Sequence, residues 1–162
     1  EHTWGTSLLA WLIASNLSET GEVIDTGKVM TMALLHDISE SQISDIPHSA
    51  VRLGGRVMKD GKLSAEYAAI DDIFDSQCSI HQNSKSIITE YYEQKSLESR
   101  IVHGADILDM LLHAISLERN GVNPKLLKPF FDSGEDKLAS LNIMLVSEIY
   151  SNIEAEHKKN LF

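Results

Sequence analysis

The 162-residue chain is 43% hydrophobic, which predicts one globular domain rather than a disordered chain, a coiled coil or several domains. Its 24 acidic and 14 basic side chains give a formal net charge of -10, which argues against extended nucleic acid as a partner, because affinity for DNA depends on lysine and arginine at phosphates. The longest apolar run, residues 8–14, is too short to cross a membrane, and the single cysteine, Cys78, cannot form an internal disulfide, so we expect a cytoplasmic protein without a membrane segment.

Hydrophobic residues recur at helical spacing through the first half of the chain. A first helix is expected over residues 1–16 and a second over residues 25–41, so that the second runs through the pair His36-Asp37. Residues 50–60 are either a loop or a short helix, because two consecutive glycines interrupt the pattern. A clean apolar stripe then predicts a helix over residues 63–74.

The second half of the chain shows the same periodicity. Helices are expected over residues 80–91, from a Ser96 cap to Gly121, and over residues 138–157. The three prolines fall between these periodic segments, and the alternating pattern of strands is nearly absent. We therefore predict an all-α fold, a single helical bundle over residues 1–162.

Most familiar catalytic motifs are absent from the sequence. It contains no HExxH, CxxC or GxSxG motif, no glycine-rich phosphate loop and no dinucleotide-binding fingerprint. These absences argue against zinc proteases, structural zinc sites, serine hydrolases, P-loop enzymes and Rossmann oxidoreductases. Histidine and carboxylate side chains remain as the candidates for chemistry.

The adjacent pair His36-Asp37 lies where the second predicted helix becomes buried. The dipeptide alone is weak evidence, because this composition gives about 0.5 such pairs by chance, but both side chains continue apolar rows of the helix. A buried carboxylate must be hydrogen-bonded, paired with a base or bound to a metal, and the neighbouring histidine favours the metal over a satisfied core pair. Glu40, four residues after His36, shares the same face.

Two further polar residues lie in apolar helices. Asp106 is flanked by apolar residues on the long helix, and His2 opens a mostly apolar helix whose first turn can direct its ring inward. With the histidine-aspartate pair, they would form a mixed nitrogen and oxygen site of the kind that suits a divalent transition metal. The alternatives are that Asp106 pairs with His103 or His113 along its own helix, and that His2 is a surface residue.

The spacing of these residues resembles that of the HD superfamily of metal-dependent phosphohydrolases. Two stretches, ALLHDISESQISDIP (residues 33–47) and EYYEQKSLESRIVHGADILDMLLHAISLE (residues 90–118), are similar to those of its 5'-deoxynucleotidase branch, as is the later FFDSGEDKL. Ser44 stands where glycine is usual in that branch. The resemblance implies one HD domain over residues 1–162 with a metal site between helices, and a further helix ahead of residue 1 that this chain does not contain.

The resemblance implies roles for six residues. His2, His36, Asp37 and Asp106 are the implied ligands of one divalent ion, which would be manganese, cobalt or another transition metal, with magnesium as an alternative. Glu40 and Asp45 are implied to assist catalysis or to bind substrate. The alternatives are a solvated residue for Glu40 and a simple turn former for Asp45.

We therefore predict an enzyme, an HD-family phosphohydrolase that removes the 5'-phosphate from deoxyribonucleoside monophosphates with a metal-activated water. The implied partners are a small nucleotide substrate and a second copy of the chain in a homodimer. One alternative is an HD hydrolase of another nucleotide or phosphate ester, although Ser41 stands where the guanosine tetraphosphate hydrolases carry the aspartate of HDxxED. Another is a nonenzymatic, acidic helical interaction module.

The remaining candidates are interpreted as structural. His48, His81 and His157 are expected at the surface, and Trp4 and Trp11 in the core. Cys78 lies between periodic segments without an evident base partner, so we do not expect it to act as a nucleophile.

Overall fold

The structure, a computed structural model, describes residues 1–161, without the side chain of His48. Every regular element in this range is a helix, and none of the described residues forms a strand, which confirms the predicted all-α class. The helices are α1 (His2–Glu19), α2 (Thr26–Leu35), α3 (Glu40–Ile43), α4 (His48–Ile73), α5 (Ser79–Glu93), α6 (Leu97–Arg119), α7 (Pro124–Ser140) and α8 (Met144–Asn160).

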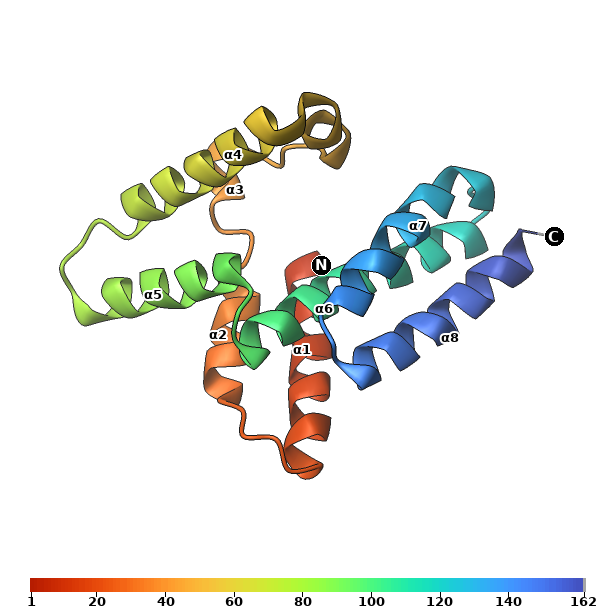
Figure 1. The fold of residues 1–162 in the computed structure, drawn as a ribbon, viewed down its shortest axis with the longest axis horizontal. Helices are drawn as coiled ribbons and strands as arrows, with labels where there is room; N and C mark the ends of the chain where they lie inside the picture. Colours follow the sequence, from red (N-terminus) through yellow and green to blue (C-terminus); the bar gives the residue numbers. More distant parts are fainter. Residues whose placement is uncertain (162) are drawn as a thin grey trace.

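Helix α6 forms the centre of the bundle (Figure 1), where it packs against α1, α2, α5, α7 and α8. Its side chains Ile101, Val102 and Leu108 have no exposed surface. Burial of an aliphatic side chain of this kind contributes roughly 1.5–3 kcal/mol to folding. The helix begins after Ser96, whose hydroxyl oxygen accepts a hydrogen bond from the backbone N–H of Ser99, so the predicted cap is confirmed.

A close contact fixes α8 against the centre of α6. A Cβ atom at Gly104 would lie 3.1 Å from Cγ2 of Val146 and 3.3 Å from Cδ1 of Leu141, so glycine allows these side chains to reach the α6 backbone. The same segment of α6 carries Asp106 on another face. The helix that bears this candidate ligand is therefore held firmly by its neighbours.

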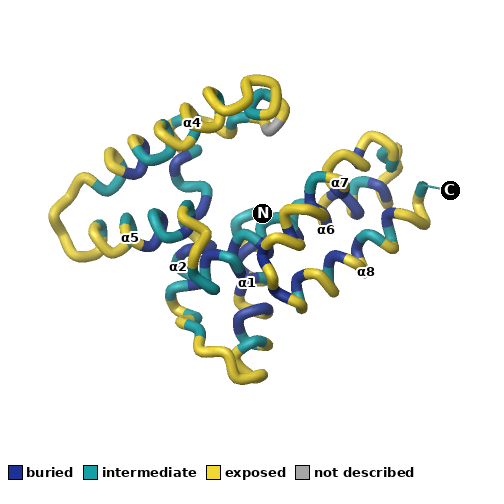
Figure 2. Tube along the Cα trace, in the orientation of Figure 1, coloured by how far each residue is buried: buried dark blue, intermediate teal, exposed yellow. Residues whose placement is uncertain are grey.

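Helix α4 lies apart from this centre and contacts α3 and α5 (Figure 1). Figure 2 shows that most residues of α4 are exposed. Ala69 and Ile70, near the end of the helix, are buried. The backbone of Gly55 has φ 59° and ψ -145°, which breaks the helical geometry inside α4. The ambiguous residues 50–60 are thus helical on both sides of a glycine kink.

The second helix ends earlier than the sequence predicted. Helix α2 stops at Leu35 rather than near Ser41, and residues 36–39 form consecutive tight turns. In one of these turns the backbone N–H of Glu40 donates to the carbonyl of Asp37 at 2.9 Å, a spacing of three residues instead of four. The change of direction leaves the His-Asp pair at the end of α2, facing α1 and α6.

The prediction was wrong in the C-terminal third of the chain. Helix α7 was not predicted, and α8 begins at Met144 rather than near Leu138. Pro129 lies inside α7, in its second turn, where the missing N–H costs only the one bond to the carbonyl of Lys125. The side chain of Asn123 caps the first turn by accepting from the N–H of Lys125 at 3.0 Å, so local capping offsets the proline.

The two tryptophans, predicted in the core, are exposed on α1. Trp4 is 70% exposed and Trp11 45%, and the neighbouring Leu8 and Leu12 share this outer face, while Ile13 on the opposite face is buried. Helix α1 is apolar on nearly all sides, so its periodicity does not reveal which face is inside. None of the helices in residues 1–161 combines the length and the apolar character that a membrane-crossing segment requires.

Candidate metal centre

The four residues predicted as metal ligands come from three segments and meet beside the first turn of α1. His2 lies in that turn, His36 and Asp37 follow α2, and Asp106 lies in the middle of α6. One ligand atom from each of His2, His36 and Asp37 lies within 4.8 Å of the other two. Oδ1 of Asp106 lies 3.1 Å from Nε2 of His2. We call these four residues the metal-centre cluster.

The metal-centre cluster is closed on one side and open on the other. The side chain of His36 has no exposed surface, whereas 41% of the His2 side chain, 40% of Asp37 and 31% of Asp106 remain exposed. The imidazole rings of His2 and His36 meet edge to face with their centroids 5.5 Å apart. Solvent, and any ligand of the cluster, therefore reaches it from the side of His2 and the carboxylates.

The hydrogen bonding of His36 fits a metal ligand. Its Nδ1 lies 2.8 Å from the carbonyl oxygen of Ala33, which can only accept, so Nδ1 carries the hydrogen. Its Nε2 is buried without a hydrogen-bond partner among the described residues and lies 3.0 Å from Oδ2 of Asp37. A nitrogen lone pair facing a carboxylate at this distance is repulsive unless a cation or a proton lies between them. The donor set thus fits a divalent ion.

The charges of the cluster favour cations. A hydrogen bond to Asp106 raises the pKa of His2 from 6.5 to about 9, against the opposing effect of burial, and Asp109 adds to the rise. Burial lowers the pKa of His36, but the neighbouring Asp37 carboxylate outweighs it and the net change is upward. For Asp37, burial favours the neutral acid, yet the two histidines lower the pKa below its ordinary value. The carboxylates of the site thus favour positive charge on both histidines.

Of the two residues predicted to assist catalysis, Glu40 is influenced by the charge of Asp37 in the cluster, and Asp45 acts on Glu40. Glu40 begins α3, and its pKa is raised by burial and by the negative charges of Asp37 and Asp45. Asp45 is exposed in the loop after α3. Between them Ser44 has φ 60° and ψ 165°, a conformation that favours glycine and costs a residue with a Cβ about 1–3 kcal/mol. This conformation explains why glycine suits the turn between Glu40 and Asp45.

Two residues that sequence reasoning missed also belong to this site. Oδ2 of Asp109 accepts a hydrogen bond from Nδ1 of His2 at 2.7 Å. Asp109 follows Asp106 by three residues on α6, and this spacing places both on one face, so the signal was present. Lys62 of α4 exerts its positive charge on Asp37 and Glu40, and no local pattern could reveal it, because the placement of α4 over α3 depends on tertiary structure.

Comparison with known proteins assigns the family. A family model described as HD domain matches residues 1–140. The chain belongs to the HD domain family. This HD domain is 30% identical over 126 residues to 5'-deoxynucleotidase HDDC2 of Dictyostelium discoideum. The match covers 75% of this chain and 63% of the Dictyostelium protein, so the chain spans less than two thirds of that relative.

Solved structures share the fold of this HD domain. A conserved hypothetical protein from Pyrococcus furiosus superposes with a TM-score of 0.77 at 27% identity, over 95% of this chain and 81% of that protein. The PH0347 protein from Pyrococcus horikoshii OT3 gives a TM-score of 0.72 at 27% identity, over 97% of this chain and 80% of that one.

The other histidines of this HD domain lie outside the cluster. His103 stacks on Tyr91, and its Nε2 donates to the backbone carbonyl of Tyr91 at 3.0 Å. His113 is exposed, so the described residues do not show either histidine paired with Asp106. The prediction for His157 was wrong, because its side chain is 3% exposed and contacts Glu118. His81 is partly buried rather than on the surface, and the side chain of His48 lies outside the described part.

Proposed function

We propose that this HD domain is a metal-dependent phosphohydrolase that removes the 5'-phosphate from deoxyribonucleoside monophosphates. The observation that carries the proposal is the convergence of two imidazole rings and two carboxylates at the open metal-centre cluster. The name of the Dictyostelium relative, a 5'-deoxynucleotidase, supports the substrate class. Family membership supports the broader assignment to hydrolytic chemistry at phosphate.

The donor set suits a divalent transition metal better than a hard cation. His2, His36, Asp37 and Asp106 would hold one ion through two nitrogens and two carboxylate oxygens, a mixture that favours manganese or cobalt over magnesium. A bound ion would acidify a water molecule and polarise a phosphoryl oxygen.

Glu40 is the proposed acid-base residue. Its pKa is raised by burial and by neighbouring Asp37 and Asp45, which brings it closer to the pH at which a side chain both takes and gives a proton. Glu40 would take the proton of the attacking water and return it to the departing 5'-oxygen. Asp45, exposed beside it, would orient Glu40 or the sugar of the substrate.

Lys62 is the proposed contact for the phosphate. A phosphate monoester is a dianion, and the carboxylates of the site repel it. Lys62 reaches this site from α4, where Oε1 of Glu66 holds its ammonium group at 2.9 Å and 27% of its side chain is exposed. Its charge acts on Glu40 and Asp45, so an incoming phosphate beside Glu40 would meet it.

The experiment that tests this function measures phosphate release from a panel of deoxyribo- and ribonucleoside monophosphates with manganese, cobalt or magnesium. We expect turnover of the deoxyribonucleotides. The substitution His113→Ala, at an exposed residue, should preserve this activity, and Asp106→Asn should abolish it. Comparable turnover of both sugar classes would overturn the deoxynucleotide assignment. Turnover of other phosphate esters alone would favour another HD hydrolase, and no uptake of any metal would favour the interaction module.

We also propose that the chain forms the homodimer that the family resemblance implies. Support comes from the outer face of α1, where Trp4, Leu8, Trp11 and Leu12 leave an apolar row exposed. Light scattering after size exclusion should give twice the chain mass, and Trp11→Glu should shift it to the monomer. The exposed Leu126→Glu on α7 is the matched control, and a monomeric starting protein would refute the dimer.

A further inference from the structure

The two ring nitrogens of His2 face different carboxylates. Nδ1 lies 2.7 Å from Oδ2 of Asp109, whereas Nε2 lies 3.1 Å from Oδ1 of Asp106 and 3.9 Å from Oδ2 of Asp37. Asp106 and Asp37 belong to the metal-centre cluster, and Asp109 does not. Asp109 therefore binds the ring nitrogen of His2 that faces away from the proposed metal.

Asp109 accepts a hydrogen bond from His2 in the same way as the Ala33 carbonyl accepts one from His36. In both histidines an oxygen atom faces Nδ1, at 2.7 Å in His2 and 2.8 Å in His36, and in both Nε2 points to the cluster. An ionised carboxylate and a carbonyl only accept hydrogen bonds, so each fixes the hydrogen on Nδ1 and leaves the Nε2 lone pair for a metal. His36 is enclosed, and the backbone carbonyl of Ala33 orients its ring. His2 lies in the first turn of a helix with 41% of its side chain exposed, and its ring has no such internal support.

Gly5 makes this contact possible. A Cβ atom at Gly5 would lie 2.0 Å from Oδ1 and 2.7 Å from Cγ of Asp109, distances that no packed side chain allows. Gly5 lies inside α1, where it has no positive φ angle and where alanine would be the better helix former. Helix propensity therefore does not explain this glycine, and the approach of Asp109 to α1 does.

We infer that Asp109 is a positioning residue of the metal centre, which fixes the tautomer and orientation of His2, and that Gly5 provides the space it occupies. This inference rests on the metal-binding part of the proposed function. It does not depend on the substrate, because it concerns the affinity of the site for the ion.

The test measures the dissociation constant of the full chain for Mn²⁺ by competition with a chromophoric chelator. Loss of an outer partner of a ligating histidine typically weakens metal binding by about 10–100-fold. We expect a loss in this range for Asp109→Ala, a smaller one for Asp109→Asn, whose amide oxygen can still accept, and a loss comparable to Asp109→Ala for Gly5→Ala. Asp136→Asn, which changes an exposed carboxylate on α7, should bind as the original chain does.

Two further readouts separate positioning from folding. Thermal unfolding of the metal-free variants should show that Gly5→Ala keeps its stability while its metal affinity falls. In the Zn²⁺-loaded protein, ¹⁵N chemical shifts of His2 should report hydrogen on Nδ1, and Asp109→Ala should lose this single tautomer.

Unchanged Mn²⁺ affinity in Asp109→Ala, or an unchanged tautomer, would overturn the inference and leave the proposed function standing. Reduced affinity together with no nucleotide hydrolysis in the original chain would overturn the function alone. A chain that takes up no metal would overturn both.

Discussion

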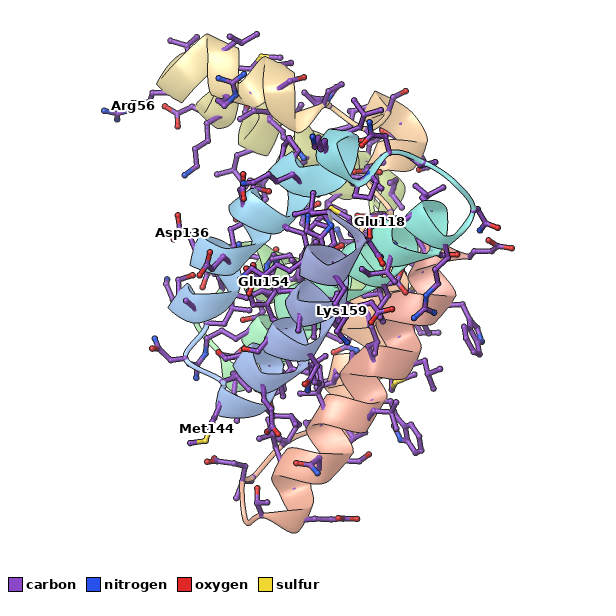
Figure 3. All side chains as sticks on the ribbon, turned by 90° about the vertical axis from the view of Figure 1, so that its right-hand side faces the viewer. Arg56, Glu118, Asp136, Met144, Glu154 and Lys159 are labelled. Carbon is purple, nitrogen blue, oxygen red and sulfur yellow. The ribbon has the colours of Figure 1, made fainter. Side chains whose placement is uncertain are left out.

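Helix α6 carries two clusters that combine histidine with carboxylate, one at its middle and one at its C-terminal end. In the second, which we call the Glu118 cluster, Nδ1 of His157 lies 2.5 Å from Oε1 of Glu118, and Nδ2 of Asn160 donates to Oε2 at 2.7 Å. The ring of His157 stacks on Phe131 with centroids 3.9 Å apart. Figure 3 labels Glu118 beside the end of α8, at the opposite end of that helix from the outward-pointing Met144.

The two clusters differ in charge and in access. In the Glu118 cluster one carboxylate faces one histidine, both of its oxygens have partners, and the two side chains are 1% and 3% exposed. At the metal-centre cluster, two histidines face three carboxylates when the neighbouring Asp109 is counted. The most exposed of these side chains, His2, is 41% exposed. Even two protonated imidazoles would leave that site negative. An excess of carboxylates and an open side, rather than the residue types alone, therefore favour the binding of a cation.

Substitutions in the two clusters should differ most in their effect on enzymatic activity. Asp37→Ala removes an anionic ligand from the metal-centre cluster, and its effect should exceed the roughly 100-fold loss that follows removal of an outer partner of a metal ligand. Phosphate release from the preferred nucleotide under manganese measures it. Asn160→Ala at the Glu118 cluster should keep activity within a few-fold, and equal losses in both variants would erase the distinction between the clusters.

The Glu118 cluster should instead dominate stability. Glu118→Ala leaves the buried His157 without its partner, and breaking a buried pair in this way costs about 3–5 kcal/mol. Urea unfolding of the metal-free chain measures the change. Glu148→Ala, an exposed carboxylate on α8, is the control and should stay within about 0.5 kcal/mol of the original chain. A cost below 1 kcal/mol for Glu118→Ala would contradict the structural role.

A smaller effect is expected at Lys62, whose charge acts on Asp37 and Glu40. Lys62→Gln should raise KM for the nucleotide about tenfold, equivalent to ~1.4 kcal/mol, because the phosphate loses its facing cation. The affinity for Mn²⁺ should not fall, since Lys62 repels the ion. Lys85→Gln, which changes a lysine of α5 that pairs with Asp71 of α4, should leave KM unchanged. Equal KM values for the two variants would show that Lys62 does not contact the phosphate.

The smallest effect concerns an ion pair outside both clusters. Nζ of Lys28 lies 2.8 Å from Oε1 of Glu90, and the two side chains are 26% and 30% exposed. Burial favours the neutral acid in Glu90, but Lys28 outweighs it and lowers the pKa below 4.5, while the hydrogen bond to Glu90 raises the pKa of Lys28 above 10.5. The pair therefore contributes its full stability between these two ordinary values.

This contribution is lost as the pH falls through the lowered pKa of Glu90. Glu90→Gln should cost about 0.5 kcal/mol at pH 7 and progressively less as the pH is lowered toward 3. Urea unfolding at a series of pH values measures this change. If the stability lost in Glu90→Gln instead increased as the pH fell, the stabilising role of the Lys28–Glu90 pair would be refuted.

The fold was predictable where capping and periodicity agree. The Ser96 cap and the apolar stripe that follows it define α6, the element that organises the bundle. Helix α7 was missed because Pro129 and many charged residues hide its narrow apolar face, which buries Leu127 and Phe131. The exposure of Trp11 was not predictable, because an all-round apolar helix carries no signal for its inner face.

The candidate site was partly predictable for a similar reason. His36 and Asp37 stood out because polar groups continued apolar rows, and the structure brings them together with His2 and Asp106, although their metal-binding role stays a prediction. His157 was expected at the surface, yet its side of α8 faces Glu118. Local composition does not show which face of a terminal helix will be covered.

We expect the metal-centre cluster to bind one divalent ion and the Glu118 cluster to bind none. Metal content of the chain after loading with Mn²⁺ and desalting tests it most directly, with His36→Ala and His157→Gln compared side by side. We expect one ion per chain in the original protein and in His157→Gln, and none in His36→Ala. Retention of the ion by His36→Ala, or its loss from His157→Gln in a folded protein, would contradict it.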